Sequence, residues 1–173
     1  LFEAYLLLLL REMPVNAVAR TVGVDDEKLW RMLHRYVDTA REAADMSTVT
    51  AVGVDETSRA TGHDYVSVFV DMDKRETLFV EEGKGSAAVG AFAQDLTAHG
   101  GDPSAVTAAS CDMSPAFISG INDHLPNAKI TFDRFHIMKV IGKAVDETRK
   151  AEAAGSPLLK KTKYLFQTNR ENL

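Results

Sequence analysis

The spacing of apolar residues changes near Thr50, and this change limits the possible folds more than any other feature of the sequence. Residues 1–49 place apolar side chains at helical spacing, whereas the residues that follow mix short β-type runs with helices. With 173 residues, the chain has room for one ordinary domain and a small one. The sequence therefore predicts an all-helical segment followed by an α/β domain. The expected boundaries are 1–41 for the helical segment, 42–49 for a linker, 50–150 for the α/β domain, and 151–173 for a tail or the start of an insertion.

Three helices are expected in the helical segment. Residues 1–11 form the first, and Pro14, at a first-turn position, opens the second. Gly23 supplies the left-handed residue that ends the second helix, and Asp25 caps the third. Two short helices joined by a tight glycine turn are typical of a helix-turn-helix. The expected buried stripe of the third helix comprises Leu29, Trp30, Leu33, Tyr36 and Val37.

The third helix also carries basic residues that indicate DNA binding. In a helix-turn-helix the later helix enters the major groove with its N-terminal half leading. Lys28, Arg31 and Arg35 lie at helical spacing opposite the apolar stripe, with His34 beside them. Such cations can contact phosphates, and one arginine can read a guanine edge. The alternative interpretation is a plain helical hairpin with a solvated outer face.

Residues 50–150 predict three strands in a meander, followed by helix, strand, helix, strand and helix. The expected elements are strands at 52–55, 65–70, 77–80, 105–111 and 128–132, and helices that begin at Ser86, after Ser114-Pro115, and near Arg134. Gly62-His63-Asp64 and the segment 71–74 are the expected hairpin turns. Right-handed crossovers would convert this order into a mixed five-stranded sheet flanked by helices. The same order is found in ribonuclease-H-like folds.

Two aspartates stand at positions that favour a metal site. Asp55 lies at the end of the first predicted strand, and Asp112 lies just past the fourth. If these strands are adjacent and parallel, the two carboxylates meet at one edge of the sheet, where open α/β sheets bind ligands. Mg²⁺ commonly takes one or two carboxylates, and two such ions about 4 Å apart support in-line phosphoryl transfer. Taken singly, an aspartate at a strand end is usually a turn or cap residue.

Five motifs, in their order along the chain, resemble the DDE transposases of bacterial insertion sequences, and most closely the ISL3 family. The motifs are the segments 52–58, 62–66, 111–117, 125–128 and 132–136. The helix-turn-helix is also similar to that of the family, so the resemblance covers nearly the whole chain.

The resemblance implies a metal-dependent enzyme. Asp55 and Asp112 would be the first two acids of the DDE triad, binding two Mg²⁺ or Mn²⁺ ions and activating water or a freed 3′-hydroxyl. The full protein would cut transposon-end DNA and join it to target DNA, acting as a homo-oligomer. The third acid of the family is a downstream Glu, which this excerpt is expected to lack, so the fragment is expected to be inactive. Glu147, 35 residues after Asp112, is expected to be a surface residue of the last helix.

Other residues near the two aspartates have two interpretations each. Asp133 and His136 resemble family motif residues; they either orient the site or approach DNA, or they cap a helix and serve structure alone. Glu56 either supports the site or points away, because side chains alternate along a strand. Cys111 is expected in the core. As the single cysteine it excludes an internal disulfide, which favours a reducing, intracellular setting. The resemblance to bacterial transposases implies a cytoplasmic protein associated with the bacterial nucleoid.

Charge is distributed unevenly along the chain. Residues 50–133 carry a net charge of −8, and residues 134–173 carry one of +5. An acidic centre can bind cations and a basic end can bind phosphates, so Lys139 and Lys143 are expected to contact DNA. The alternative is a solvated helix face.

The remaining features narrow the class of protein. The apolar run at 6–10 is too short for a membrane span, which needs about 20 residues, so no membrane partner is expected. Two other functions fit the same pattern. One is a nuclease on the same fold that cuts without strand transfer, and the other is a non-catalytic DNA-binding remnant or regulator.

Overall fold

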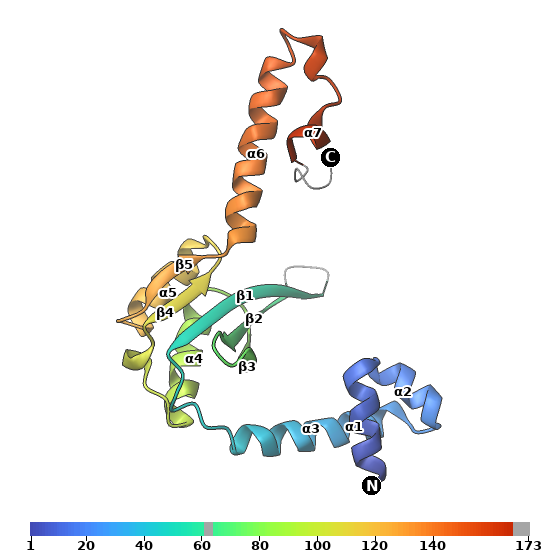
Figure 1. Ribbon diagram of the computed structural model, residues 1–173. Helices are drawn as coiled ribbons and strands as arrows, with labels where there is room; N and C mark the ends of the chain where they lie inside the picture. Colours follow the sequence, from blue (N-terminus) through green and yellow to red (C-terminus); the bar gives the residue numbers. More distant parts are fainter. Residues whose placement is uncertain (61–63, 168–173) are drawn as a thin grey trace. The chain divides into compact units, whose positions relative to one another are not determined.

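The computed structural model describes residues 1–60 and 64–167 (Figure 1). The chain forms two compact units, Leu1–Asp45 and Met46–Leu173. Gly62 and His63 of the predicted hairpin turn lie outside the described residues. No helix in the part of the chain that the structure describes is long and apolar enough to cross a membrane.

The first unit contains the three predicted helices. They are α1 (Phe2–Glu12), α2 (Val15–Val22) and α3 (Asp26–Glu42). Gly23 is left-handed, with a φ of 70°, and its N–H donates to the carbonyl of Ala19 at the end of α2. The Asp25 side chain accepts the N–H of Glu27 and caps α3. Pro14 is the N-cap of α2 rather than a residue of its first turn.

The buried stripe of α3 differs from the predicted one. Leu29 is 1% exposed as expected, but Met32 takes the next core position at 7% exposed. Trp30 is 48% exposed, and Tyr36 and Val37 are exposed as well. The core of this unit comprises Leu6, Val18, Leu29 and Met32. Tyr36 and Val37 follow the part of α3 that joins this core, and the hydroxyl of Tyr36 donates to the Glu3 carboxylate of α1 instead of being buried.

The second unit contains the predicted mixed sheet. Its five strands are β1 (Ala51–Ala60), β2 (Asp64–Asp71), β3 (Glu76–Glu82), β4 (Ala108–Cys111) and β5 (Lys129–Phe132). Their order in the sheet is β3-β2-β1-β4-β5. The pairs β1–β2 and β2–β3 are antiparallel, and the pairs β1–β4 and β4–β5 are parallel. This is the order expected of a ribonuclease-H-like fold.

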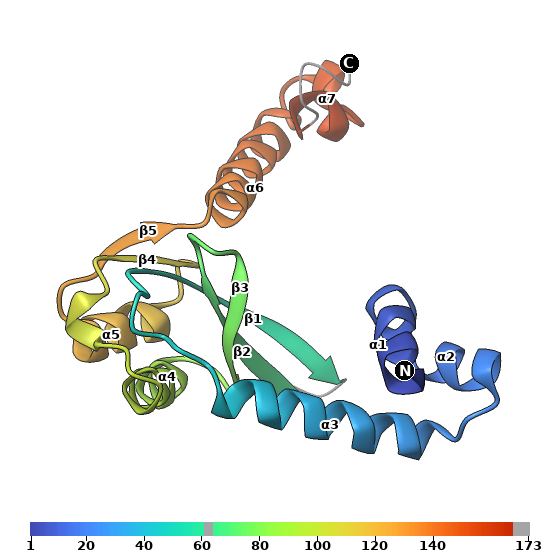
Figure 2. The same ribbon diagram turned by 60° about the horizontal axis from the view of Figure 1, so that its bottom comes forward.

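Two helices cover one face of the sheet, α4 (Ser86–Ala98) and α5 (Pro115–His124), and they lie on the same side of it in Figure 2. Phe92 of α4 stacks on Phe69 of β2, with ring centroids 4.5 Å apart. The two helices approach so closely at Gly120 that a Cβ there would lie 2.7 Å from the Cα of Ser86. The core therefore sits between these helices and one face of the sheet.

The fourth strand is shorter than predicted. It begins at Ala108 instead of residue 105, because a 3-10 turn (Pro103–Ala105) occupies the preceding residues. The Asp102 side chain accepts the N–H of Ser104 and caps this turn. The pKa of Asp102 is lowered by two hydrogen bonds, the stronger effect coming from the Ser104 hydroxyl and the weaker from this N–H.

The long helix after β5 is α6 (Arg134–Glu152), followed by a 3-10 turn (Pro157–Leu159) and the short helix α7 (Lys163–Gln167). Many apolar side chains of α6 are exposed, among them Ile137 and Ile141 at 37% and 48%. The residue that α6 does bury is Asp146. In the described residues, α6 thus contributes little to the core of the sheet.

Candidate functional site

Asp55 and Asp112 occupy equivalent positions on adjacent parallel strands. The register pairs Gly53 of β1 with Ser110 of β4, and each aspartate lies two residues further along its chain. The residues just before them, Val54 and Cys111, are buried in the core. Since successive side chains of a strand point to opposite faces, the two aspartates belong to the face that α4 and α5 leave uncovered.

Asp55 lies in the middle of β1, whereas we predicted it at the end of a strand. The parallel pairing with β4 stops at Gly53, but β1 continues as an antiparallel ribbon with β2, in which Asp55 pairs with Val68. The sequence prediction ended the strand at the first charged residue, although a strand with one solvated face accepts charges at alternate positions.

A cavity of about 400 Å³ connects the two aspartates. Its lining also includes Asp133, which directly follows β5, and three apolar residues of the β2 strand and turn, Val68, Val70 and Met72. Asp55, Asp112 and Asp133 therefore line one cavity whose other wall is apolar.

Gly53 keeps this cavity open, and sequence reasoning did not single it out. A Cβ at this position would lie 2.9 Å from Cγ2 of Val70 and 3.6 Å from Cγ of Met72. A glycine inside a strand, two residues before a candidate ligand, is the signal that could have identified it. The apolar residues Val70 and Met72 carried no such signal.

Backbone N–H groups fix each carboxylate. Oδ1 of Asp55 accepts the N–H of Glu56 at 2.9 Å, and Oδ1 of Asp112 accepts the N–H of Ser114 at 2.8 Å. Among the described residues, Oδ2 of either aspartate has no hydrogen-bond donor. One oxygen of each carboxylate is thus held in place while the other can take a ligand.

Asp133 is engaged more fully than the other two aspartates. Its Oδ1 accepts the N–H of Phe135 at 2.9 Å as the N-cap of α6, and its Oδ2 lies 3.1 Å from Nδ1 of His136. The hydrogen bond from Phe135, and then the contact with His136, lower the pKa of Asp133. Asp133 therefore caps α6, as one of its two interpretations expected, and it also lines the cavity of the other two aspartates.

The carboxylates of Asp55 and Asp112 fit a divalent cation that prefers oxygen ligands. The described residues contain no group of three or more His, Cys, Asp and Glu placed to hold a metal ion. Asp55 and Asp112 alone suit Mg²⁺ or Mn²⁺, because Mg²⁺ commonly takes only one or two carboxylates and fills its other positions with water and phosphate.

Two neighbours of the aspartates complete the description of the site. Glu56 is half-buried and also lines the cavity, where its N–H holds Asp55. Cys111 lies in the core as predicted, and burial, with the charge of Asp112, raises the pKa of its thiol. The thiol is therefore a packing group.

The basic residues predicted on α6 are exposed. Nζ of Lys143 lies 3.9 Å from Oε1 of Glu147, and both side chains are largely in solvent. Lys139 is exposed one turn earlier. Glu147 is a surface residue of α6, as we expected, and it does not line the cavity of the two aspartates.

The predicted DNA-binding residues of α3 divide into two groups. Lys28, Arg31 and His34 are exposed. Arg35 instead donates from Nη2 to both carboxylate oxygens of Glu3 in α1, each at 2.7 Å, and lowers the pKa of Glu3. The hydroxyl of Tyr36 donates to the same carboxylate at 2.9 Å. Sequence reasoning missed this contact because Glu3 and Arg35 are 32 residues apart.

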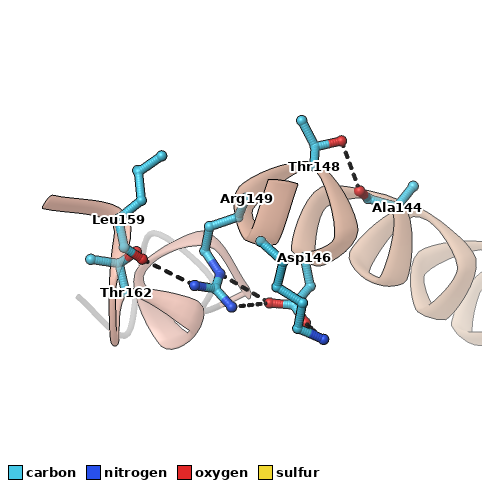
Figure 3. A network of polar contacts seen from close by, with 7 residues as sticks. Ala144, Asp146, Thr148, Arg149, Leu159 and Thr162 are labelled. Atoms are coloured by element: carbon cyan, nitrogen blue, oxygen red, sulfur yellow. Dashed lines mark hydrogen bonds and ion pairs between the residues drawn. The ribbon is translucent and has the colours of Figure 1, made fainter. Parts of the chain in front are cut away.

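A network of charged groups links the end of α6 to the residues after it (Figure 3). The buried carboxylate of Asp146 accepts from Nε and Nη2 of Arg149, at 3.0 and 2.8 Å, and pairs with Lys150 at 2.8 Å. Nη1 of Arg149 and the hydroxyl of Thr162 both donate to the carbonyl of Leu159. The network thus connects residues 159–162 to the end of α6.

Two family models match the chain. The model of the ISL3 DDE domain, described as "Transposase", matches residues 52–173. The model described as "Helix-turn-helix domain of transposase family ISL3" matches residues 1–37.

Similar curated proteins include two transposases of insertion sequences. The transposase for insertion sequence element IS1001 of Bordetella parapertussis is 29% identical over 178 residues, covering 95% of this chain and 42% of that protein. The transposase for insertion sequence element IS1557 of Mycobacterium tuberculosis is 26% identical over 131 residues, covering 76% of this chain and 28% of that protein. The chain thus spans less than half the length of these relatives.

Proposed function

Because the chain belongs to the ISL3 family of transposases, we propose that its second unit is part of a DDE catalytic domain and that its first unit binds transposon-end DNA. The full protein would cut that DNA and join it to target DNA. The observation that supports the catalytic proposal most directly is the placement of Asp55 and Asp112 at equivalent positions of adjacent parallel strands, in one cavity.

Asp55 and Asp112 are the proposed ligands of Mg²⁺ or Mn²⁺. Bound divalent ions would neutralise charge on the scissile phosphate and favour the ionised form of an attacking hydroxyl. Asp55 is held in a continuous strand and Asp112 by the start of α5, so both carboxylates are positioned before any ligand arrives. We assign Asp133 and His136, which follow β5, to positioning the site. We assign Glu56 to holding Asp55 through its N–H.

The third acid of the triad is proposed to come from outside residues 1–173. Glu147 lies 35 residues after Asp112, but it is paired with Lys143 on the solvent face of α6 and is not proposed as this acid. With two of three acids, the 173-residue chain is expected to bind metal weakly and to have little or no activity on its own.

The DNA contacts are proposed on both units. On α3, Lys28, Arg31, His34 and Arg35 face DNA, and the exposed Arg35 also holds α1 to α3 through Glu3. On α6, Lys139 and Lys143 contact phosphates. Such contacts would make the affinity fall steeply with salt.

Titration with Mn²⁺ tests the metal site. We expect paramagnetic broadening of NMR signals around residues 53–57 and 110–114, and loss of this broadening in the Asp55→Asn/Asp112→Asn double variant. Glu147→Gln is the matched control, because it removes one exposed carboxylate and should leave the broadening unchanged. Broadening that survives in the double variant, or that centres elsewhere, would favour a non-catalytic DNA-binding protein.

A further inference from the structure

We propose that Trp30 contacts DNA directly, laying its indole against a thymine in the major groove beside the base pair that Arg31 reaches. This inference rests on the proposed DNA binding of the first unit. It assigns a specificity-determining role to a residue whose spacing in the sequence suggested only core packing.

The first observation is the exposure of Trp30. It is the single tryptophan of the chain, and it is 48% exposed while its neighbour Leu29 and the next core residue Met32 are buried. Burial of an indole contributes more apolar area than that of most side chains. The small core of this unit does not use that area, so the indole surface is available to a partner.

The second observation is the direction in which Trp30 lies on α3. With 3.6 residues per turn, Arg31 lies about 200° around the helix from Leu29, His34 about 140°, and Trp30 about 100°. Trp30 and His34 therefore border Arg31 on one flank of the outward surface, and Lys28 borders it on the other. All four residues are exposed.

The rings of Trp30 and His34 form one surface. Their centroids are 6.3 Å apart, with a tilt of 36° between the planes. The two residues are one helical turn apart, in the half of α3 that a helix-turn-helix inserts into the groove. An aromatic surface in that position, with its two rings tilted by 36°, fits the edge of a base pair better than it fits a phosphate.

The third observation is the charge of the first turns of α3. Asp25, Asp26 and Glu27 precede Lys28 and Arg31, and Arg35 is already paired with Glu3. Residues 25–33 therefore carry three acidic groups against two basic ones, so attraction to phosphates alone is weak here. Apolar contact has to supply part of the affinity of this helix.

Thymine is the base that suits such a contact. It alone presents a methyl group in the major groove, and apolar side chains recognise it there. The indole Nε1–H can donate at the same time to an acceptor on a neighbouring base or phosphate. The ligand is thus duplex DNA that carries a thymine next to the position of Arg31.

Fluorescence of Trp30 gives the test, because excitation at 295 nm reports on this residue alone. The probe is the duplex pool that the wild-type chain enriches from a random-sequence library, labelled with fluorescein. We expect saturation with this pool to reduce acrylamide quenching of Trp30 at least twofold. We also expect Trp30→Ala to weaken binding of the pool about tenfold and to lose enrichment of one thymine, while Trp30→Phe retains most of both.

Salt dependence separates Trp30 from a phosphate contact. Trp30→Ala should leave the slope of log affinity against log salt unchanged, whereas Lys28→Ala, which removes an exposed cation on the other flank of Arg31, should reduce it by about 1. Val37→Ala is the matched control, since it removes an exposed apolar residue in the later half of α3 and should change neither affinity nor slope.

The outcomes distinguish this inference from the function on which it rests. If the wild-type chain enriches no duplex, the DNA-binding proposal fails and this inference fails with it. If the chain binds the pool and Arg31→Ala weakens that binding, but quenching of Trp30 is unchanged, only the role of Trp30 is overturned. The quenching measurement uses the wild-type chain, so it remains decisive even if Trp30→Ala fails to fold.

Discussion

Helices α5 and α6 begin in the same way and differ in what their apolar residues contact. Each follows a parallel strand and an aspartate, Asp112 or Asp133, whose Oδ1 accepts an N–H at the start of the helix. In α5, Phe117 and Ile121 are fully buried in the core shared with α4 and the sheet. In α6, the equivalent apolar residues remain partly in solvent, and the buried side chain is a carboxylate.

The difference shows that apolar spacing defines a face of a helix but does not define its partner. The partner of α5 is α4, which approaches at Gly120 more closely than a side chain would allow. The contacts of α6 are with the short elements that follow it, through the charged network of Asp146. Close packing thus positions α5, whereas charged contacts connect α6 to the residues that follow it.

Truncation of an apolar residue should show the largest difference in stability between the two helices. Phe117→Ala is expected to lower the free energy of unfolding by about 3–5 kcal/mol, because it leaves a cavity in the core. Ile141→Ala on α6 should change it by no more than about 0.5 kcal/mol. Urea unfolding followed by circular dichroism compares the two. An equal cost at both positions would mean that α6 is packed in solution and would remove the difference.

Glycine replacements should give opposite signs in the two helices. Gly120→Val places atoms against the backbone of Ser86 and should cost about 1–3 kcal/mol. At Gly142 of α6 an added Cβ meets nothing within 4 Å, so Gly142→Ala should stabilise the chain by up to about 1 kcal/mol. Thermal melts of the two variants test this, and destabilisation by Gly142→Ala would show an unrecognised close approach.

Removal of the charge of Asp146 should affect only the end of α6. Asp146→Asn weakens the pairing with Arg149 and Lys150, so amide hydrogen exchange should accelerate in residues 153–162 and stay unchanged in α5. The neighbouring change Glu147→Gln is the control, because that carboxylate is exposed and its pairing with Lys143 is loose. Equal acceleration in both variants would contradict the importance of the network.

Acid should reproduce the effect of Asp146→Asn more gradually. Hydrogen bonds from Lys150 and then Arg149 lower the pKa of Asp146 in the folded chain. A carboxylate with a lowered pKa contributes stability that is fully present above its unfolded pKa of about 3.9 and is lost as pH falls through the folded value. Hydrogen exchange in residues 153–162 should therefore begin to accelerate only below about pH 4. Acceleration between pH 5 and 7 would require a different titrating group.

Much of the fold was predictable because local signals agreed with one another. The glycine at 23, the cap at Asp25 and the β-branched and aromatic run at 65–70 each define their element without distant contacts. The pairing of β1 with β4 followed from the order of elements, and it predicted that Asp55 and Asp112 share one edge. Strand order and the candidate ligands were therefore accessible from the sequence.

The errors arose where the answer depends on distant residues. Trp30 was assigned to the core from its spacing, but the three-helix core closes with Leu29 and Met32. The ion pair of Arg35 with Glu3 of another helix was likewise not predicted. The helices were expected to flank the sheet, but several apolar side chains of α6 are exposed, because periodicity cannot say which surface a helix meets.

The position of Asp55 within β1 also bears on how reliably the sheet assembles. A slip of one residue between β1 and β2 would exchange the two faces of β1, turning Val54 to solvent and Asp55 into the apolar space beside Phe69 and Phe92. An ionised carboxylate in that space is costly, so the misaligned sheet would be disfavoured as soon as the helices closed over it. The residue proposed to hold a metal in the finished protein would thereby also disfavour a misaligned sheet during folding.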